Sequence, residues 1–479
     1  MASLLTLPLE LLVRVSSFLT TPELGALRLT CQQVEKSLYE WFSQEFFTKK
    51  QFMLTHKSLQ AFVDISRHTS FSQKLSHVII ATNIYRSEIA ASTYRQGYVD
   101  QQALMDTGVD REMLTEAFKN LKNLRTVGIR DFNNHERARD GITWTSWGAP
   151  TVEKETGRPL DFVSTLDCPH HATSRFMEHL FQTLIYALGK ANQTPEELEV
   201  LLRRQALSDC AFHVPNFNLR AVEPVLLGLK KLFLRVDAVP ARIGNNPAVR
   251  SNVSAPIFRR FLKRTPNVEH LRLNLARSND VQNRSFMQWL ALPPRASDPL
   301  ADDHFDPPPV DLAFLSILDL GQCVIEVEIV LDILVKYAPT LQGLNLWKLS
   351  LWPSSGTTAV LDEPNLWSKF FRMMAKIPQL QLNQVKVGML SQGPTHVQFK
   401  SPDRDDAPLL KVKQYSGTEM GAFLKELEVE ATVMWPKPIA PRDEESDEDE
   451  EMTDDDEDES ASDEDGENEG DDDDNDDED

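Results

Sequence analysis

The sequence predicts an α/β fold in three parts: a short N-terminal helical segment, a solenoid of strands and helices with a parallel sheet, and a disordered acidic tail. Three observations predict it. Apolar residues recur at helical spacing over residues 1–45. Leucines then recur at strand spacing, with helical segments between them, in residues 46–436. Acidic residues dominate residues 437–479.

Three short amphipathic helices are predicted in the N-terminal segment. Thr21 and Pro22 are expected to start the second helix, as N-cap and first helical residue. So small a unit cannot bury all of its apolar surface, so its leucines either pack on the larger domain or form a docking surface. The apolar residues with one-face spacing are Leu11, Leu12, Val15, Phe18 and Leu19 in the first helix, and Val34, Leu38, Trp41 and Phe42 in the third.

Two short motifs stand out near the start of the chain. Residues 7–12 read Leu-Pro-Leu-Glu-Leu-Leu and residues 27–31 read Leu-Arg-Leu-Thr-Cys, which is similar to the opening and the middle of the F-box motif. The first 85 residues thus resemble fungal F-box proteins. The resemblance implies a substrate-receptor subunit of an SCF-type cullin–RING ubiquitin ligase, bound to the Skp linker subunit and, through it, to the cullin. The linker contacts that it implies are Leu7, Pro8, Leu11, Leu12, Val15, Leu24, Leu27 and Cys31.

A leucine-rich cadence, Leu-x-x-Leu-x-Leu or a near variant, recurs in the middle of the chain. Clear copies begin at Leu229, Val268, Leu315 and Leu341, and weaker copies at residues 121 and 380. Alternating apolar residues predict strands, and strand–helix–strand order predicts that these strands are parallel. Because the copies are unevenly spaced, we expect an irregular leucine-rich-repeat-like solenoid, with an ordinary α/β domain as the alternative.

Polar and aromatic residues between the leucines are expected on the opposite face of the sheet. They form a candidate surface for an unknown protein substrate, although a solvated face without a ligand is the alternative. Segments 131–174 and 291–310, which are rich in Gly, Pro and charge, are expected to be loops. The candidate substrate-binding residues are Phe233, Arg235, Arg272, Asn274, Asn345 and Trp347.

The acidic charge of the chain is concentrated at its C-terminus. The formal net charge is −23, yet residues 441–479 contain 27 Asp or Glu and a single Arg, so residues 1–440 carry only +3. Self-repulsion without apolar burial predicts disorder, and the tail either only solubilises the chain or contacts a basic partner. Hydroxyl residues with an acidic residue three positions later are candidate phosphorylation sites: Ser446, Thr453, Ser460 and Ser462.

No catalytic motif stands out: the sequence has no Gly-rich phosphate loop, Gly-x-Ser-x-Gly or His-Glu-x-x-His. The Cys and His residues at 168–171 and 210–213 lack the paired spacing of a zinc site, so neither metal nor cofactor is expected. No basic stripe indicates direct nucleic-acid binding, and no apolar run is long enough for a membrane span. Four cysteines indicate a reducing compartment, the cytosol or nucleus.

Together these features predict a non-catalytic adaptor that presents a bound protein for ubiquitination. A second hypothesis is an acidic-tailed chaperone or scaffold for basic proteins that acts outside a ligase. A third is a hydrolase or transferase whose site matches none of the motifs above.

Overall fold

The computed structural model describes residues 4, 7–89, 91–133, 144–163, 170–239, 254–276, 280–294, 307–353, 365–400 and 408–435. Those up to Trp435 belong to one compact unit. The candidate phosphorylation sites and the segment 437–479 lie outside the described residues, and so does Cys168.

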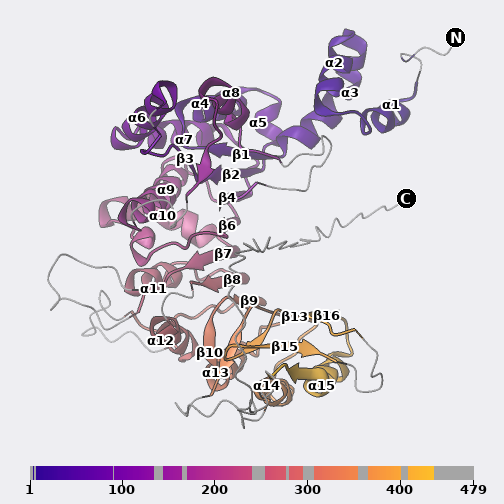
Figure 1. The fold of residues 1–479 in the computed structure, drawn as a ribbon, viewed down its shortest axis with the longest axis vertical. Helices are drawn as coiled ribbons and strands as arrows, with labels where there is room; N and C mark the ends of the chain where they lie inside the picture. The colour runs from indigo at the N-terminus through magenta and orange to yellow at the C-terminus, as the bar shows by residue number, and fades with distance from the viewer. Residues whose placement is uncertain are drawn as a thin grey trace, which may run out of the picture. The chain divides into compact units, whose positions relative to one another are not determined.

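Ten strands of the described chain form one sheet in which sequence order is also spatial order (Figure 1). Every neighbouring pair is parallel except the last, β13–β16, which is antiparallel. The predicted mixed α/β fold with a parallel sheet is therefore confirmed. The strands are β1 Lys49–Met53, β2 His77–Ala81, β4 Thr126–Arg130, β6 Glu197–Leu201, β7 Lys231–Val236, β8 His270–Leu275, β9 Ile317–Gly321, β11 Gly343–Trp347, β13 Gln384–Gly388 and β16 Val412–Ser416.

Helices connect the strands and pack on one another along one side of this sheet (Figure 1). Buried side chains of helices and strands join in one continuous apolar core. The helices from this part of the chain are α4 His56–Arg67, α5 Phe71–Lys74, α6 Ser92–Asp106, α7 Val109–Asn120, α8 Ala149–Thr156, α9 His170–Lys190, η3 Asp209–Phe212 (a 3-10 turn), α10 Asn216–Gly228, α11 Pro256–Lys263, α12 Asp280–Ala291, α13 Val327–Tyr337, α14 Leu366–Met374 and α15 Met420–Glu430.

The remaining strands of the described residues form two smaller sheets. Five short strands pair in the order β10-β12-β14-β15-β17, and β3 pairs with β5. Their bounds are β3 Asn83–Ile84, β5 Asp161–Phe162, β10 Val324–Glu326, β12 Ser350–Trp352, β14 Ser391–Gln392, β15 Thr395–Phe399 and β17 Ala431–Val433.

The leucine cadence correctly predicts six strands of the large sheet. Each of the four clear copies lies on a strand, β7, β8, β9 or β11, and the two weaker copies lie on β4 and β13. In β8 the apolar residues Leu271, Leu273 and Leu275 are buried, while the residues between them are half-buried. The leucines thus face the helices, and the alternate positions face away from them.

The N-terminal segment forms three helices, as predicted, and they share a small core of their own. They are α1 Leu9–Ser16, α2 Thr21–Leu29 and α3 Gln32–Phe47. Leu12, Leu24, Val34 and Leu38 are buried together in this core. The N-cap of α2 is Thr20 rather than Thr21, because Thr20 and Glu23 form a reciprocal capping box.

Helix α3 also ties this small unit to the sheet. Phe47, at its end, stacks on Phe71 of α5 with 3.9 Å between the ring centroids. Phe42 and Phe46 contact both apolar cores. The chain then enters β1 two residues after α3 ends.

The prediction of a loop over 131–174 is wrong for much of that segment. It contains helix α8 and strand β5, and helix α9 begins at His170. Gly148 and Gly157 flank α8 with φ values of 89° and 72°, a conformation that glycine adopts without strain. Val152 is the only buried residue of this helix. Because the helix is otherwise polar or exposed, no apolar periodicity predicted it. In the second predicted loop, residues 292–294 and 307–310 contain no helix or strand.

Replacing Leu12 with Ala should destabilise the three-helix unit far more than replacing Leu11. Leu12 is only 4% exposed, whereas Leu11 is 52% exposed. Loss of a buried leucine costs about 2–5 kcal/mol, and a surface change usually less than about 0.5 kcal/mol. Limited proteolysis should therefore cut within residues 9–47 much faster in Leu12→Ala, and at the wild-type rate in Leu11→Ala. Equal rates in the two variants would contradict the assignment of Leu12 to the core.

Candidate functional site

The exposed side of α1 carries a stripe of apolar side chains. Pro8, Leu11, Val15 and Phe18 follow one another at three- and four-residue intervals, from the N-cap of α1 to the turn after it, and Leu11 and Val15 share one face of the helix. Leu11, Val15 and Phe18 are 52%, 45% and 74% exposed. The opposite side of α1, with Leu12 and Ser16, is buried. Helix α1 is therefore apolar on two sides, and the three-helix core covers only one of them.

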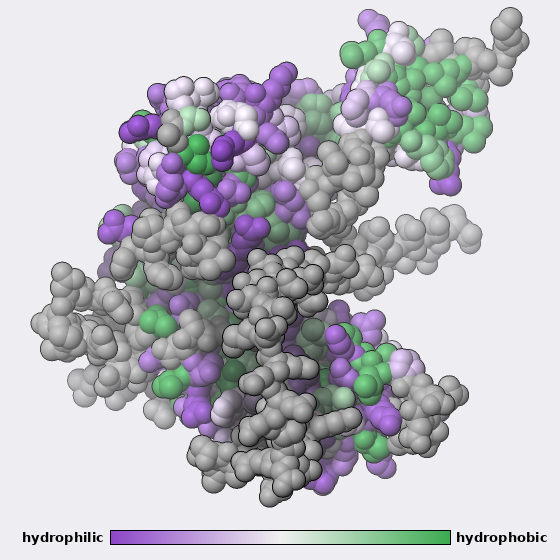
Figure 2. Space-filling model, in the orientation of Figure 1, coloured by the Kyte–Doolittle hydropathy of each residue, from purple (hydrophilic) through white to green (hydrophobic). Residues whose placement is uncertain are grey.

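Other apolar side chains of these helices are also exposed. Leu9 is 51% exposed and Leu29, at the end of α2, is 88% exposed. Figure 2 shows hydrophobic residues gathered over the N-terminal helices. We call Pro8, Leu9, Leu11, Val15, Phe18 and Leu29 the apolar α1–α2 surface. An exposed cluster of this kind usually marks a contact with another molecule.

The structure divides the eight predicted linker contacts into three groups. Pro8, Leu11 and Val15 are exposed on the apolar α1–α2 surface. The half-buried ones are Leu7, Leu27 and Cys31, the last two packed against the small core. Leu12 and Leu24 are buried inside it, so a partner does not reach their side chains in this conformation. Leu9, Phe18 and Leu29 belong to the surface but were not among the predicted contacts.

A charged and aromatic pairing holds the helices beneath this surface in place. The guanidinium of Arg28, on α2, lies 3.5 Å from the ring centroid of Phe42, on α3. Its Nη2 also lies 3.4 Å from Glu35 Oε1. Because both partners belong to α3, Arg28 fixes α2 against α3 and so sets the position of Leu29.

The second candidate surface is the face of the large sheet that points away from the helices. Parallel register aligns its residues in rows across the strands. One row contains Glu199, Phe233, Arg272, Asp319 and Asn345, on five neighbouring strands. Phe233, Arg272 and Asn345, three of the predicted substrate-binding residues, are therefore neighbours on one face.

Asp319 is the centre of this row, and it was not among the predicted site residues. Its Oδ2 accepts from Arg272 Nε at 2.9 Å and lies 3.1 Å from His270 Nε2. Its Oδ1 accepts from Asn345 Nδ2 at 2.7 Å. Burial acts to raise the pKa of Asp319, but the hydrogen bonds and charges of His270 and Arg272 outweigh it, so this pKa is lowered.

The same row is reinforced by ring contacts. The guanidinium of Arg272 lies 4.7 Å from the ring centroid of Phe233. The imidazole of His270 meets Phe233 edge-on, with centroids 4.6 Å apart. These contacts hold neighbouring strands together through Phe233, Arg272 and Asn345. The three side chains are half-buried, so part of each is also open to a ligand.

Asn274 and Trp347 lie in the next row, where each faces a glycine on the adjacent strand. A Cβ on Gly321 would lie 2.4 Å from Asn274 Oδ1, and a Cβ on Gly388 would lie 2.3 Å from the Trp347 ring. Only glycine leaves room for these side chains to lie flat on the sheet. Lys386 Nζ is 5.5 Å from the Trp347 ring centroid.

Arg235, the sixth predicted residue, lies near the carboxyl end of β7. Its Nη1 donates to the carbonyl oxygens of Leu202 and Arg203, at 2.9 and 2.5 Å. It therefore contacts the loop that follows β6, a loop that no sequence pattern had singled out. The six predicted residues all lie on one face, and Arg235 belongs to the same row as Asn274 and Trp347.

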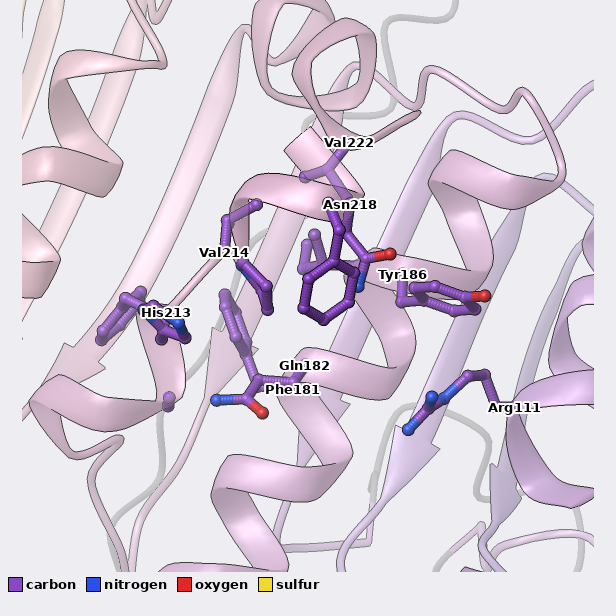
Figure 3. A pocket seen from close by; sticks show the side chains of 13 residues that line it. Arg111, Phe181, Gln182, Tyr186, His213, Val214, Asn218 and Val222 are labelled. Carbon is purple, nitrogen blue, oxygen red and sulfur yellow. The ribbon is translucent and has the colours of Figure 1, made fainter. Parts of the chain in front are cut away.

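A shallow pocket lies on the helix side of the sheet, with a volume of about 170 Å³. It is formed by α7, α9, η3 and α10. Figure 3 shows Arg111 and Tyr186 at one end and His213 at the other. Burial, followed by the charges of Arg260 and Arg264, lowers the pKa of His213. The lining residues include no carboxylate to pair with this imidazole, and the pocket is smaller than the roughly 300–1,000 Å³ usual for ligand sites.

Of the residues with a faint zinc-like pattern, only Cys210 and His213 have described side chains. No three His, Cys, Asp or Glu side chains of the described residues form a metal-binding group. Burial, together with the carboxylates of Glu178 and Asp209, raises the pKa of Cys210 to about 11, so its thiol stays protonated at neutral pH. Within the described ranges, no helix has both the length and the apolar character of a membrane span.

Comparison with known proteins adds no relative: no family model matches this chain, and no curated protein has a similar sequence. The resemblance of the first 85 residues to F-box proteins therefore depends on the residues quoted above.

Replacing Asp319 with Asn should destabilise the fold at neutral pH by roughly 3 kcal/mol, because Arg272 and His270 would lose a buried charged partner. A lowered pKa means that the carboxylate stabilises the fold above its unfolded pKa, about 3.9, and that this contribution is lost as pH falls below it. Urea denaturation should therefore show a difference between wild type and Asp319→Asn that is full above about pH 5 and shrinks below about pH 4. A difference that does not depend on pH would contradict this role.

Proposed function

We propose that this chain is a non-catalytic substrate receptor of an SCF-type cullin–RING ubiquitin ligase. In this proposal helices α1–α3 are an F-box, and the apolar α1–α2 surface docks on the Skp linker subunit, which holds the cullin. The observation that carries the proposal is the stripe of Leu11, Val15 and Phe18, which remains exposed although α1 already has a buried side.

The amount of exposed apolar surface is suited to a stable contact. Full burial of a Leu, Val or Phe side chain contributes ~1.5–3 kcal/mol, and these side chains have about half or more of that area still to bury. Five such residues, together with half-buried Leu27 and Cys31 beside them, could offset the cost of association. The Leu12 core would keep the three helices folded before the partner arrives.

The second part of the proposal concerns the sheet. We infer that residues 46–435 form an irregular leucine-rich-repeat-like solenoid whose polar face presents a substrate protein. Its sequential parallel strands and their leucine cadence support this reading. A receptor of this kind needs no reactive group, since holding a substrate lysine near the conjugating enzyme accelerates transfer by proximity. The cytosol and the nucleus are the compartments where it would act.

The composition of residues 441–479 favours a second candidate, a chaperone or scaffold for basic proteins that acts outside a ligase. A segment with 27 acidic residues can attract basic surfaces without any fixed structure. The two candidates differ in one partner: only a ligase subunit should co-purify with the linker subunit and the cullin.

The proposed docking surface can be tested with the double variant Leu11→Asp/Val15→Asp in the full-length chain. Two buried apolar contacts would be lost, so affinity for the purified linker subunit should fall roughly 100-fold or more. Phe217→Asp/Val281→Asp is the matched control, because these residues are 86% and 71% exposed on other helices. It should bind like wild type.

Two results would contradict docking: no binding of the wild-type chain to the linker subunit, or equal losses in the two double variants. If the linker binds but the cullin never joins the complex, the scaffold hypothesis is favoured instead.

A further inference from the structure

The two outermost strands of the large sheet differ in how their outer sides are covered. Strand β1 is buried, and the segment beside it bonds to its edge: the Trp147 N–H donates to the Gln51 carbonyl oxygen at 2.8 Å, and Gln51 Nε2 donates to Ser146 Oγ at 2.9 Å. Strand β16 is the last of the sheet, and its residues alternate between exposed and half-buried. Within the described residues, the chain therefore covers the first edge of the sheet and leaves the last one open.

The hydrogen bonds on either side of β16 show how its backbone groups point. The Met389 N–H donates to the carbonyl oxygen of Lys411 at 3.0 Å, and the Gly417 N–H donates to that of Asn383 at 2.8 Å. In an antiparallel pair, alternate residues bond to the same neighbour. The odd-numbered residues of β16 therefore direct their N–H and C=O groups to β13.

The even-numbered residues direct theirs to the opposite side. Leu410 exchanges two hydrogen bonds with Phe399, at 2.9 and 3.1 Å, which confirms this direction at the start of the strand. The backbone N–H and C=O groups of Val412, Gln414 and Ser416 point the same way, and they have no hydrogen-bond partner within the described residues. All three residues are exposed. We call the outward side of these three residues the open edge.

The usual protections of a strand edge are absent here. Native edge strands are often blocked by proline or by a charged side chain. Residues 412–416 contain no proline, and their single charged residue, Lys413, pairs through Nζ with Glu426 and Glu430 of α15. Tyr415 also stacks on a ring of α15. Both side chains are thus directed to the helix, and neither blocks the open edge.

We propose that the open edge binds β16 of a second copy of this chain, antiparallel and centred on Gln414. N–H and C=O groups that alternate along an extended strand match another extended backbone. In this register Gln414 pairs with Gln414 of the second copy, and Val412 pairs with Ser416. Every outward N–H and C=O group of both open edges then has a partner.

Side chains and chain path support this occupant. Lys413 stands opposite Tyr415 of the second copy, so no like charges face each other. Leu410 is already paired with β15, and the chain turns toward α15 at Gly417, where φ is 151°. These two limits leave only residues 412–416 available for pairing. The strand that a second copy offers therefore has the same length as the open edge.

The contact is small, since it uses five residues of each copy, whereas a standard interface has roughly 20–30 residues a side. We therefore expect a reversible dimer rather than a permanent one. Two copies would present two polar sheet faces, and a partner with two binding segments would bind them more tightly than one. This inference does not depend on docking to a ligase.

Sedimentation equilibrium of the full-length chain, from about 5 μM to about 300 μM, tests the pairing. The buffer contains about 0.5 M salt, because each copy has a formal net charge of −23 and their repulsion must be screened. Wild type should dimerise reversibly. Gln414→Pro removes one outward N–H but keeps the bonds to β13, so the fold should be retained and dimer affinity should fall at least about tenfold. Gln414→Thr keeps this N–H, and as the matched control it should dimerise like wild type.

A pair of charged variants tests the register. Val412→Asp/Ser416→Asp places two carboxylates opposite each other in the proposed pairing, whereas Val412→Asp/Ser416→Lys places opposite charges there. The first variant should dimerise at least about threefold more weakly than the second. Both variants change the same two exposed residues, so a general disturbance of the strand would affect them alike.

Four outcomes would overturn the proposal. One is a wild-type chain that stays monomeric throughout this range. Another is a dimer that Gln414→Pro leaves intact, and a third is equal association of the two charged variants. The last is a dimer abolished by Leu11→Asp/Val15→Asp, which would place the contact at the apolar α1–α2 surface instead.

Discussion

Strands in the middle of the large sheet present apolar side chains to the helices and mainly polar side chains to the other face. Parallel register repeats this arrangement from strand to strand, because a residue at one position is flanked by residues at the same position on its neighbours. The rows of leucines on one face build the core. The rows on the opposite face contain polar side chains, which need hydrogen-bond partners there. Asp319 supplies such a partner to Arg272 and Asn345, from two different strands.

Side chains on the polar face pack closely, so the same residues both support the sheet and form the candidate ligand surface. Trp347 lies over Gly388, and Asn274 lies over Gly321, so each ring or amide occupies space that a neighbouring glycine leaves open. At the carboxyl edge, the buried carboxylate of Asp131 accepts from the backbone amides of Arg203 and Arg204 and so fixes the loop after β6. The centre of the face is thus internally paired through Asp319.

Much of the fold could be predicted from sequence, because the local spacing of apolar residues indicates which segments form strands and which form helices. The cadence at Leu229, Val268, Leu315 and Leu341 identifies strands whose leucines alternate. Strands β1 and β2 escaped prediction because nearly all of their residues are buried, which removes the alternation. The burial of Leu12 was not predicted, because adjacent leucines 11 and 12 lie on different sides of α1 and spacing alone does not say which side faces the core.

Contacts between residues far apart in the sequence could not be predicted from any local pattern. Asp131 and the loop of Arg203 are about 70 residues apart, and nothing near either one indicates the other. Of the candidate docking surface, the resemblance named Pro8, Leu11 and Val15, which are exposed. The surface also includes Leu9, Phe18 and Leu29, whose exposure depends on how the three helices pack.

The central claim, that another subunit covers the exposed side of α1, is tested most directly by amide hydrogen exchange of the full-length chain with and without the purified linker subunit. The account predicts slower exchange in residues 9–29 when the linker is present, and unchanged exchange in strands β6–β13. Unchanged exchange in residues 9–29, at linker concentrations high enough to saturate binding, would contradict it.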